Sequence, residues 1–291
     1  MKISQLGEFG LIDALKKYAP VSKAVIKGIG DDAAVLPYSK REYLILTTDM
    51  LSEDAHFTRR MPSRAIGHKA LACSISDIAA MGGLPTFAVV SIGIPGNLSV
   101  RFIKDVYKGM QRTARDFNVS IVGGDTIKTD KMVINVALLG MIEKKYLTTR
   151  DGAKAGDRIF VTGPLGGSLK SGRHLNFCPR LAQARFLVEK FRPSAMIDIS
   201  DGLSGDLNHI LKAGRVGARL DHASIPRHKG VSLSQALNDG EDFELLFTLS
   251  PKKARSLMDW QARQKSFYFY PIGAITTNAN EKIDAKSFVH F

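Results

Sequence analysis

The chain contains few cysteines, and this scarcity excludes whole classes of protein. Among its 291 residues, Cys73 and Cys178 are the only cysteines. Two cysteines cannot build a disulfide framework, and they favour a reducing compartment. The first ten residues, "MKISQLGEFG", also lack the apolar core of a signal peptide. We therefore expect a cytoplasmic protein.

Long apolar runs are scarce too, and the longest uncharged stretch does not have the pattern of a membrane span. Residues 78–100 carry no charged side chain and are numerous enough to cross a bilayer. The stretch contains Gly82, Gly83, Pro85 and Pro95, which would interrupt a helix and leave backbone groups unpaired in lipid. We predict a helix end, a buried strand over "TFAVVSIGI" and a turn, and we expect no membrane partner.

Negative charge is in deficit, since the formal net charge is +13. The positive residues occur in scattered pairs such as Arg59-Arg60 and Lys144-Lys145, without interleaved aromatic residues or a nucleic-acid-binding motif. This pattern favours a basic, solvated surface over a nucleic-acid interface, so we expect no nucleic-acid partner.

Strand and helix patterns alternate along the chain, which predicts an α/β fold. Helices are expected from Ser63 to Gly82, over 99–117, after Ser204 and from Pro251 to about residue 265, with Ser63 and Ser204 as N-caps. The strands expected between them are "YLILTTD", "TFAVVSIGI", "VSIV" before a "GGDT" turn, "KMVINVALLGMI", "AMID" and "DFELLFTL". Composition becomes charged and glycine-dotted from about residue 142, so we predict two domains, 1–142 and 143–291.

Six aspartates stand beside or near glycine, serine or threonine, most of them at the ends of predicted strands: Asp32, Asp49, Asp77, Asp125, Asp198 and Asp201. One such residue usually caps a helix or stabilises a turn. Six of them suggest a shared site, because small neighbours let a phosphate or a metal approach the backbone. Oxygen ligands without a histidine or cysteine cluster suit Mg²⁺, so we predict magnesium between these acids and a bound phosphate.

The stretch "GIGDDAAVL", residues 28–36, nearly matches the glycine loop that binds dinucleotides. Asp31 and Asp32 would repel a bare pyrophosphate by about 4 kcal/mol per charge pair at ~4 Å and an effective dielectric of 20. A cation between them removes this conflict. Other phosphate motifs are missing, because "GPLGGSLK" has the wrong spacing for a P-loop and the kinase catalytic loop is absent. Dinucleotide binding remains a weak alternative.

In this order, seven motifs resemble the thiamine-monophosphate kinase family over nearly the whole chain: "GIGDDAAVL", "TTDM…AHF", "KALACSISDIAAMGGLP", "VGGDT", "TRDGAKAGD", "DISDGLSGDL" and "GEDFELLF". The superfamily also includes aminoimidazole ribonucleotide synthetase. The resemblance implies an α/β (α+β type), two-domain aminoimidazole ribonucleotide synthetase-like fold. In that fold the N-terminal sheet forms a barrel across a homodimer, and both domains line the active-site cleft.

The resemblance also implies a reaction, in which the γ-phosphoryl group of ATP moves onto thiamine monophosphate with several Mg²⁺ ions assisting. The acceptor is itself a phosphate monoester with a pKa of about 6, so no general base is required at neutral pH. The alternatives are another ATP-using enzyme of the superfamily, such as aminoimidazole ribonucleotide synthetase, and a magnesium-nucleotide-binding protein without catalysis.

Site residues follow from the same resemblance, motif by motif. The magnesium ligands it implies are Asp32, Thr47, Thr48, Asp49, Asp77, Asp125, Asp198 and Asp201, and it implies that Asp49, Asp77 and Asp125 among them are catalytic. The ATP contacts it implies are Gly124, Asp125, Arg150 and Ser200. The thiamine-side contacts it implies are His56, Glu241 and Phe288. An acid and an aromatic face suit a thiazolium cation and an aminopyrimidine.

Overall fold

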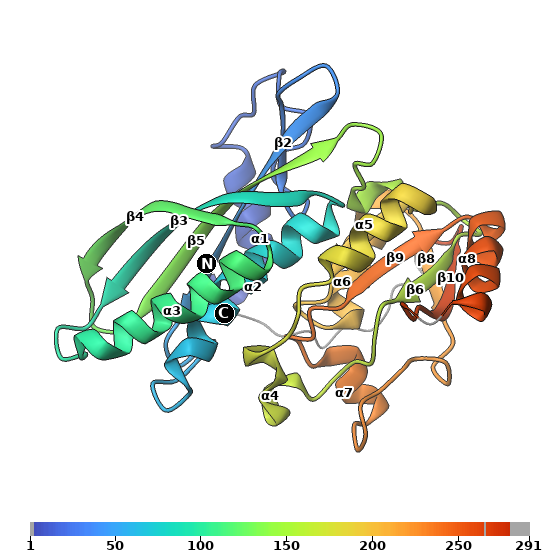
Figure 1. Ribbon diagram of the computed structural model, residues 1–291. Helices are drawn as coiled ribbons and strands as arrows, with labels where there is room; N and C mark the ends of the chain where they lie inside the picture. Colours follow the sequence, from blue (N-terminus) through green and yellow to red (C-terminus); the bar gives the residue numbers. More distant parts are fainter. Residues whose placement is uncertain (1–2, 265, 280–291) are drawn as a thin grey trace.

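The computed structural model describes residues 3–264 and 266–279, which form two five-stranded sheets with helices around them (Figure 1). The first sheet has the order β1-β2-β5-β3-β4 and the second the order β7-β9-β6-β10-β8. The α/β class is confirmed. Neither sheet closes into a barrel within the described residues, so a barrel across two copies stays a prediction.

The first sheet and its helices use the N-terminal half of the chain. Its elements are α1 (Ile3–Lys16), β1 (Ala34–Pro37), β2 (Glu42–Ser52), α2 (Ser63–Ala80), β3 (Leu84–Ile94), α3 (Val100–Asp116), β4 (Ser120–Lys128) and β5 (Val133–Glu143). The strand pairs are antiparallel except for β3 and β4, which α3 connects as a parallel crossover. Helix α2 packs against β2 and β5, and α3 packs against α2, so the two helices cover one face of the sheet.

The second sheet lies in the C-terminal half. Its elements are η1 (Arg150–Gly152), β6 (Arg158–Val161), α4 (Ser168–Ser171), η2 (Arg173–Leu175), α5 (Leu181–Lys190), β7 (Ala195–Asp198), α6 (Leu203–Gly214), β8 (Gly217–Leu220), α7 (Leu233–Asn238), β9 (Leu245–Leu249), α8 (Pro251–Arg263) and β10 (Tyr270–Thr276). The two halves are in contact, since α2 packs against α5 and Phe243 belongs to the core of the first sheet.

The two faces of the first sheet differ in burial because side chains alternate along a strand. On the inner face, towards α2, Ile45 on β2 and Val136 on β5 are fully buried. The outer face leaves large apolar side chains exposed: Leu46, Met50, Phe87, Val89, Val122 and Ile127. An exposed apolar face of this kind is typical of a surface that contacts another protein.

Several local predictions were wrong at the ends of elements. Pro62, not Ser63, occupies the N-cap of α2, and Gly202, not Ser204, occupies that of α6. Ser204 is fully buried inside the first turn of α6 and makes no capping bond. The "GGDT" motif is not a turn, because β4 continues through it to Lys128. Strand pairing with β3 overrides the turn preference of its glycines.

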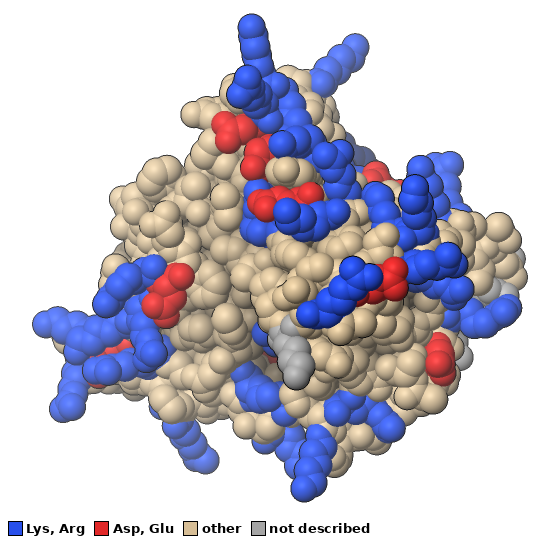
Figure 2. Space-filling model, turned by 45° about the vertical axis from the view of Figure 1, so that its right-hand side comes forward, with Lys and Arg blue, Asp and Glu red and all other residues tan. Residues whose placement is uncertain are grey.

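The surface agrees with the charge pattern of the sequence. Lys and Arg side chains occupy separate parts of the face seen in Figure 2, with uncharged surface between them. They do not form one continuous stripe on this face. Within residues 3–264 and 266–279, no helix is both long and apolar enough to span a membrane.

Candidate active site

Three aspartates from distant parts of the chain converge beneath the inner face of the first sheet. One carboxylate oxygen from each of Asp32, Asp77 and Asp198 lies within 4.8 Å of the others. Asp32 precedes β1, Asp77 lies in the last turn of α2, and Asp198 ends β7 in the second sheet. We call these three residues, together with Asp49, the inner carboxylates.

Hydroxyl groups hold the inner carboxylates in place. Thr47 Oγ1 on β2 donates to Asp77 Oδ2 at 2.6 Å and lies 3.1 Å from the backbone oxygen of Asp32. Ser76 Oγ donates to Asp198 Oδ2 at 2.6 Å. Asp49 accepts from Ser74 Oγ at 2.7 Å and is also hydrogen-bonded to Asp77. Asp49 therefore extends the group along β2.

Burial and mutual repulsion perturb the ionisation of this group. Burial, followed by the charges of neighbouring aspartates, raises the pKa of Asp198 to about 8 and that of Asp77 well above its usual value. Burial also raises the pKa of Asp49. A set of buried acids that resist ionisation together needs positive charge to stabilise it, and oxygen donors of this type match the preference of Mg²⁺.

One positive side chain already reaches the inner carboxylates. Arg150 Nη2 donates to Asp32 Oδ1 at 2.7 Å and Nε donates to Asp32 Oδ2 at 3.2 Å, a two-point contact. The backbone N–H of Arg150 meets both carboxylate oxygens of Asp31 at 3.3 Å. Burial and the charge of Asp32 raise the pKa of Asp31 to about 6. Gly30 has a φ of 125°, a region open mainly to glycine, which allows this turn.

A cavity of about 730 Å³ opens beside the inner carboxylates and collects most of the remaining predicted site residues. Its lining includes Thr48 and Asp49 from β2, His56 from the following loop, and Ser200, Asp201 and Glu241 from the C-terminal half. The structure thus brings residues predicted for metal, nucleotide and thiamine contacts to one place.

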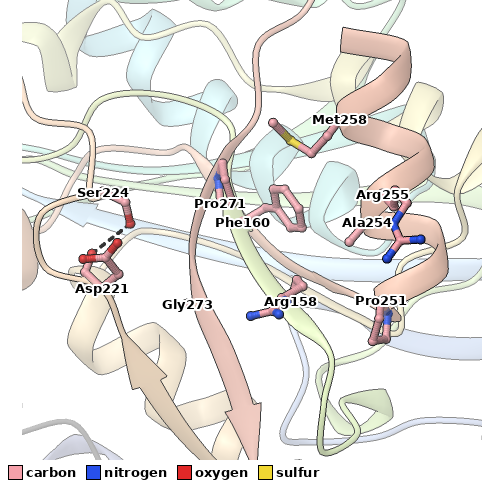
Figure 3. A pocket seen from close by; sticks show the side chains of 10 residues that line it. All are labelled: Arg158, Phe160, Asp221, Ser224, Pro251, Ala254, Arg255, Met258, Pro271 and Gly273. Carbon is pink, nitrogen blue, oxygen red and sulfur yellow. Dashed lines mark hydrogen bonds between the residues drawn. The ribbon is translucent and has the colours of Figure 1, made fainter. Parts of the chain in front are cut away.

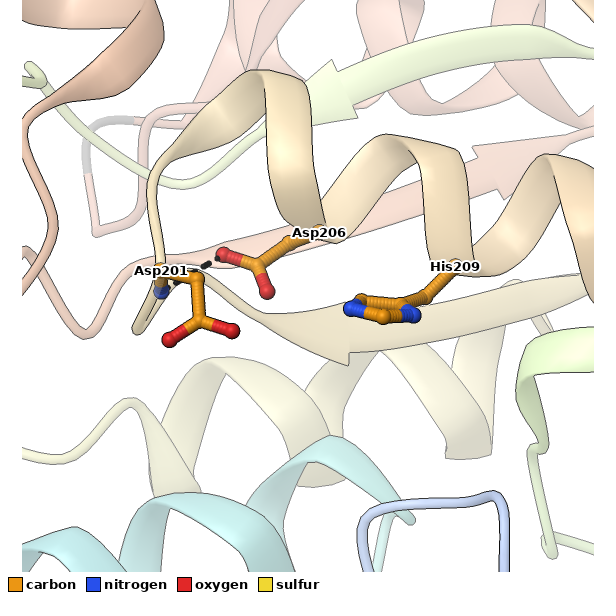
Figure 4. A group of neighbouring side chains, drawn as sticks. All are labelled: Asp201, Asp206 and His209. Carbon is orange, nitrogen blue, oxygen red and sulfur yellow. Dashed lines mark hydrogen bonds between the residues drawn. The ribbon is translucent and has the colours of Figure 1, made fainter. Parts of the chain in front are cut away.

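Asp201 belongs to a second group of possible metal ligands. One ligand atom from each of Asp201, Asp206 and His209 lies within 4.8 Å of the others (Figure 4). Asp206 Oδ2 accepts the backbone N–H of Asp201 at 3.1 Å, which fixes the turn before α6. Burial and nearby positive charges lower the pKa of His209 to about 4, so its ring is neutral at pH 7. Asp206 and His209 were not among the predicted site residues, although their spacing of three residues places them on one helix face.

Asp125, Gly124 and Thr48 are not brought into the inner carboxylates. Asp125 on β4 lies opposite Ser91 on β3, which lies opposite Asn135 on β5, which in turn lies opposite Met50 on β2. All four residues line one small cavity. At about 4.8 Å per strand, Asp125 lies ~14 Å from β2. Close packing requires glycine at position 124, because a Cβ there would lie 1.8 Å from the backbone oxygen of Val90 on β3.

Thr48 points to the same outer face of the sheet, where its hydroxyl contacts Asn135 Oδ1 at 3.0 Å. Phe288 lies outside the described residues. The roles of Asp125, Gly124, Thr48 and Phe288 therefore stay predictions.

A hollow of about 520 Å³ on the second sheet has a different character (Figure 3). The floor is the buried ring of Phe160, and Arg158 and Arg255 stand at its rim. It contains none of the predicted site residues and only one carboxylate, Asp221. The larger cavity, beside the inner carboxylates, is therefore the candidate active site.

Comparison with known proteins agrees with this geometry. A family model described as AIR synthase related protein, N-terminal domain, matches residues 30–142. That segment contains Asp32, Asp49 and Asp77 and all of the first sheet except the last residue of β5. The matched segment therefore resembles the N-terminal domain of AIR synthase-related proteins.

Relatives narrow this class further. The chain is 34% identical over 289 residues to the thiamine-monophosphate kinase of Aquifex aeolicus, covering 89% of this chain and 91% of the relative. It is 38% identical over 257 residues to that of Rhodopirellula baltica, covering 81% and 80%. The structure of AaThiL complexed with AMPPCP and TMP matches with a TM-score of 0.88 at 32% identity, covering 100% of this chain and 99% of the other. The chain belongs to the thiamine-monophosphate kinase family, as its motifs predicted.

Proposed function

We propose that this chain transfers the γ-phosphoryl group of ATP to thiamine monophosphate and so produces thiamine diphosphate. Membership of the family supports this activity, as does the similarity to a structure complexed with AMPPCP and TMP. The observation that carries the proposal is the convergence of acids from four separate segments beside one cavity: Asp32, Asp49, Asp77 and Asp198.

The donor set of the site fits Mg²⁺. The inner carboxylates and the Thr47 hydroxyl would hold it, and we propose Thr48, Asp125 and Asp201 as further ligands on the basis of the resemblance. When bound, Mg²⁺ neutralises the phosphate oxygens of the two anionic substrates and orients them. The chain itself contributes a rigid arrangement of acids, because hydroxyl donors fix the orientation of Asp49, Asp77 and Asp198.

The residues of the chain position the reactants rather than activate a nucleophile. Thiamine monophosphate brings its own phosphate oxygen, whose pKa of about 6 leaves it ionised at neutral pH. We propose Arg150, Ser200, Gly124 and Asp125 as the ATP contacts. Arg150 uses Nε and Nη2 for Asp32, which leaves Nη1 as the guanidinium nitrogen that would meet a phosphate.

The thiamine end would lie near His56 and Glu241, which line the same cavity as Asp49. The carboxylate of Glu241 suits the thiazolium cation and the amino group of the pyrimidine. Phe288 would add an aromatic face. The phosphate of the substrate then points towards the inner carboxylates, where the transfer takes place.

We further propose that the chain works as a homodimer whose two first sheets form a barrel. The exposed apolar outer face supports this, because Phe87 and Val122 are 51% and 61% exposed in the single chain. Asp125 and Thr48 lie on the same face, so a second copy there would change their surroundings.

We also propose the two domains 1–142 and 143–291, each with its own sheet, and a cytoplasmic location that suits two free cysteines.

The test is a single incubation of the purified chain with ATP, Mg²⁺ and thiamine monophosphate, followed by chromatographic detection of thiamine diphosphate. A parallel incubation replaces thiamine monophosphate with formylglycinamidine ribonucleotide, the substrate of the alternative synthetase. Formation of thiamine diphosphate and no turnover of the ribonucleotide is the expected result. ATP binding without any product would instead support a non-catalytic binding protein.

A further inference from the structure

Lys69 is a buried lysine that the sequence analysis did not assign to any role. It lies in α2, and its side chain is completely buried. Its ammonium group is in ion-pair contact with Glu241 Oε2 and donates to the backbone oxygen of His56 at 3.1 Å. Both partners line the 730 Å³ cavity, and both are proposed thiamine contacts.

Burial of a lysine is costly, so such a residue needs a specific partner. The desolvation of a buried ammonium group costs several kcal/mol, and lysine is almost never fully buried unless it is paired. Lys69 comes from the N-terminal half and Glu241 from the loop before β9 in the C-terminal half. Their ion pair therefore connects the two halves at the inner end of the cavity.

The backbone and the ion pair together fix the Glu241 carboxylate. Glu241 has a φ of 69°, the left-handed region that non-glycine residues rarely adopt, and its N–H donates to the Ser200 oxygen at 2.7 Å. Because Lys69 occupies Oε2, Oε1 is the oxygen that can accept a hydrogen bond from a ligand in the cavity.

His56 is fixed in a similar way. Its Nδ1 accepts the backbone N–H of Ser52 at 3.0 Å, which sets the orientation of the ring. Its carbonyl oxygen accepts from Lys69. One ammonium group thus holds the two residues that would meet the thiamine moiety, and it does so without lining the cavity itself.

We infer that Lys69 is a positioning residue for the thiamine end of the substrate. It orients the Glu241 carboxylate and the His56 loop towards the aminopyrimidine and the thiazolium, and it acts only through them. This inference rests on the proposed function, because it concerns recognition of the same substrate.

The test uses the Lys69→Met variant, whose side chain keeps a similar length without the charge. We expect the KM for thiamine monophosphate to rise at least tenfold, and its Kd by calorimetry to rise in parallel, while the KM for ATP stays within threefold of the wild-type value. A loss that reflects general damage would affect both substrates. If Lys69→Met is insoluble, Lys69→Gln is measured against the same criteria.

A double-mutant cycle with Glu241→Gln separates positioning from an independent effect. If Lys69 acts through Glu241 and the His56 loop, adding Lys69→Met to Glu241→Gln raises the KM for thiamine monophosphate by much less than Lys69→Met raises it in the wild-type chain. Effects that multiply in the double variant would overturn the inference.

Arg180→Met is the control, because Arg180 also forms an ion pair with a buried glutamate, Glu244, and neither residue lines the cavity. This variant is expected to lose stability and to keep the wild-type KM for thiamine monophosphate. A wild-type chain that forms no thiamine diphosphate would refute the proposed function. An active wild type with an unchanged KM in Lys69→Met would refute the positioning role alone.

Discussion

The two faces of the first sheet carry polar residues of quite different kinds. On the inner face, Thr47 contacts the half-buried Asp77, and Asp49 contacts the buried Ser74. On the outer face, Thr48 contacts Asn135 among exposed apolar side chains, and Met50 is 62% exposed. Consecutive residues of β2 therefore lie in two separate environments, one polar and one largely apolar.

This difference teaches that a motif written as consecutive letters is not a cluster in space. The sequence "TTDM" places three site candidates, Thr47, Thr48 and Asp49, side by side, but the pleat of β2 sends alternate side chains to opposite faces. The inner residues, Thr47 and Asp49, contact the Asp77 carboxylate on α2. The outer residues would contact carboxylates in the same way only if a second copy of the chain covered their face.

The strongest test of the comparison removes an inner acid. Asp77→Asn should lower kcat/KM at saturating Mg²⁺ by at least about a thousandfold, close to 4 kcal/mol, because an amide cannot replace a carboxylate in the proposed ligand set. Steady-state kinetics checks this. Asp221→Asn, which changes an exposed acid at the hollow on the second sheet, should keep the wild-type rate. A rate for Asp77→Asn within tenfold of wild type would remove the inner carboxylates from the mechanism.

The next test places charge on the outer face. Phe87→Asp should convert a dimer into single chains of 31.8 kDa, because an unpaired carboxylate would be buried at the apolar interface. Light scattering coupled to size-exclusion chromatography measures the mass. Leu169→Asp, at a position 45% exposed on α4, is the control and should remain dimeric. A monomeric wild type would contradict the proposed barrel.

The sequence was sufficient for the parts of the fold that depend on periodicity. The helical repeat over 99–117 matches α3, and the uncharged stretch resolves into the end of α2, strand β3 and a turn. The acids at element ends were a good guide as well. Asp32, Asp77 and Asp198 do converge, although no local pattern fixes which acids meet.

Other features depend on tertiary contacts that no local pattern reveals. Lys69 has the sequence environment of an ordinary helix residue, and only the approach of the Glu241 loop gives its ammonium group a partner. The glycines of "GPLGG" also resemble a phosphate loop. However, the N–H groups of Gly166 and Gly167 donate to Asp242 Oδ2 at 2.7 Å and Asp239 Oδ2 at 3.0 Å. Carboxylates of the chain already occupy the place that a phosphate would need.

Asp242 offers a test of whether a buried acid with a raised pKa is enough to define a metal site. Burial raises the pKa of Asp242 to about 7, from 3.8. The folded state therefore binds the Asp242 proton more tightly than the unfolded state does. This tighter binding stabilises the fold fully below pH 3.8, and the stabilisation is lost as the pH rises to about 7.

Asp242→Asn cannot ionise, so its free energy of unfolding should exceed that of the wild type by an amount that grows over this range, to the order of 2 kcal/mol at pH 8. Urea titrations at pH 5 and pH 8 measure the difference. Added Mg²⁺ should leave this difference unchanged, in contrast to its effect on the inner carboxylates. A difference that Mg²⁺ abolishes would make Asp242 a metal ligand.

The smallest effect comes from the two neighbouring threonines of β2. Thr47→Val removes the hydroxyl that holds Asp77, and a hydrogen bond to a charged group contributes about 1.5–3 kcal/mol, so kcat/KM should fall about tenfold or more. Thr48→Val makes the same chemical change one residue further, on the outer face. It should cost less than about threefold, because the hydroxyl contacts the neutral Asn135 and because water can take the place of one neutral ligand of a magnesium ion. The pair is matched in size and in strand propensity, so the ratio of the two rates isolates the face of the sheet. Equal losses of kcat/KM would mean that Thr47 on the inner face and Thr48 on the outer face both act in catalysis. The outer face could then take part only where another copy of the chain covers it.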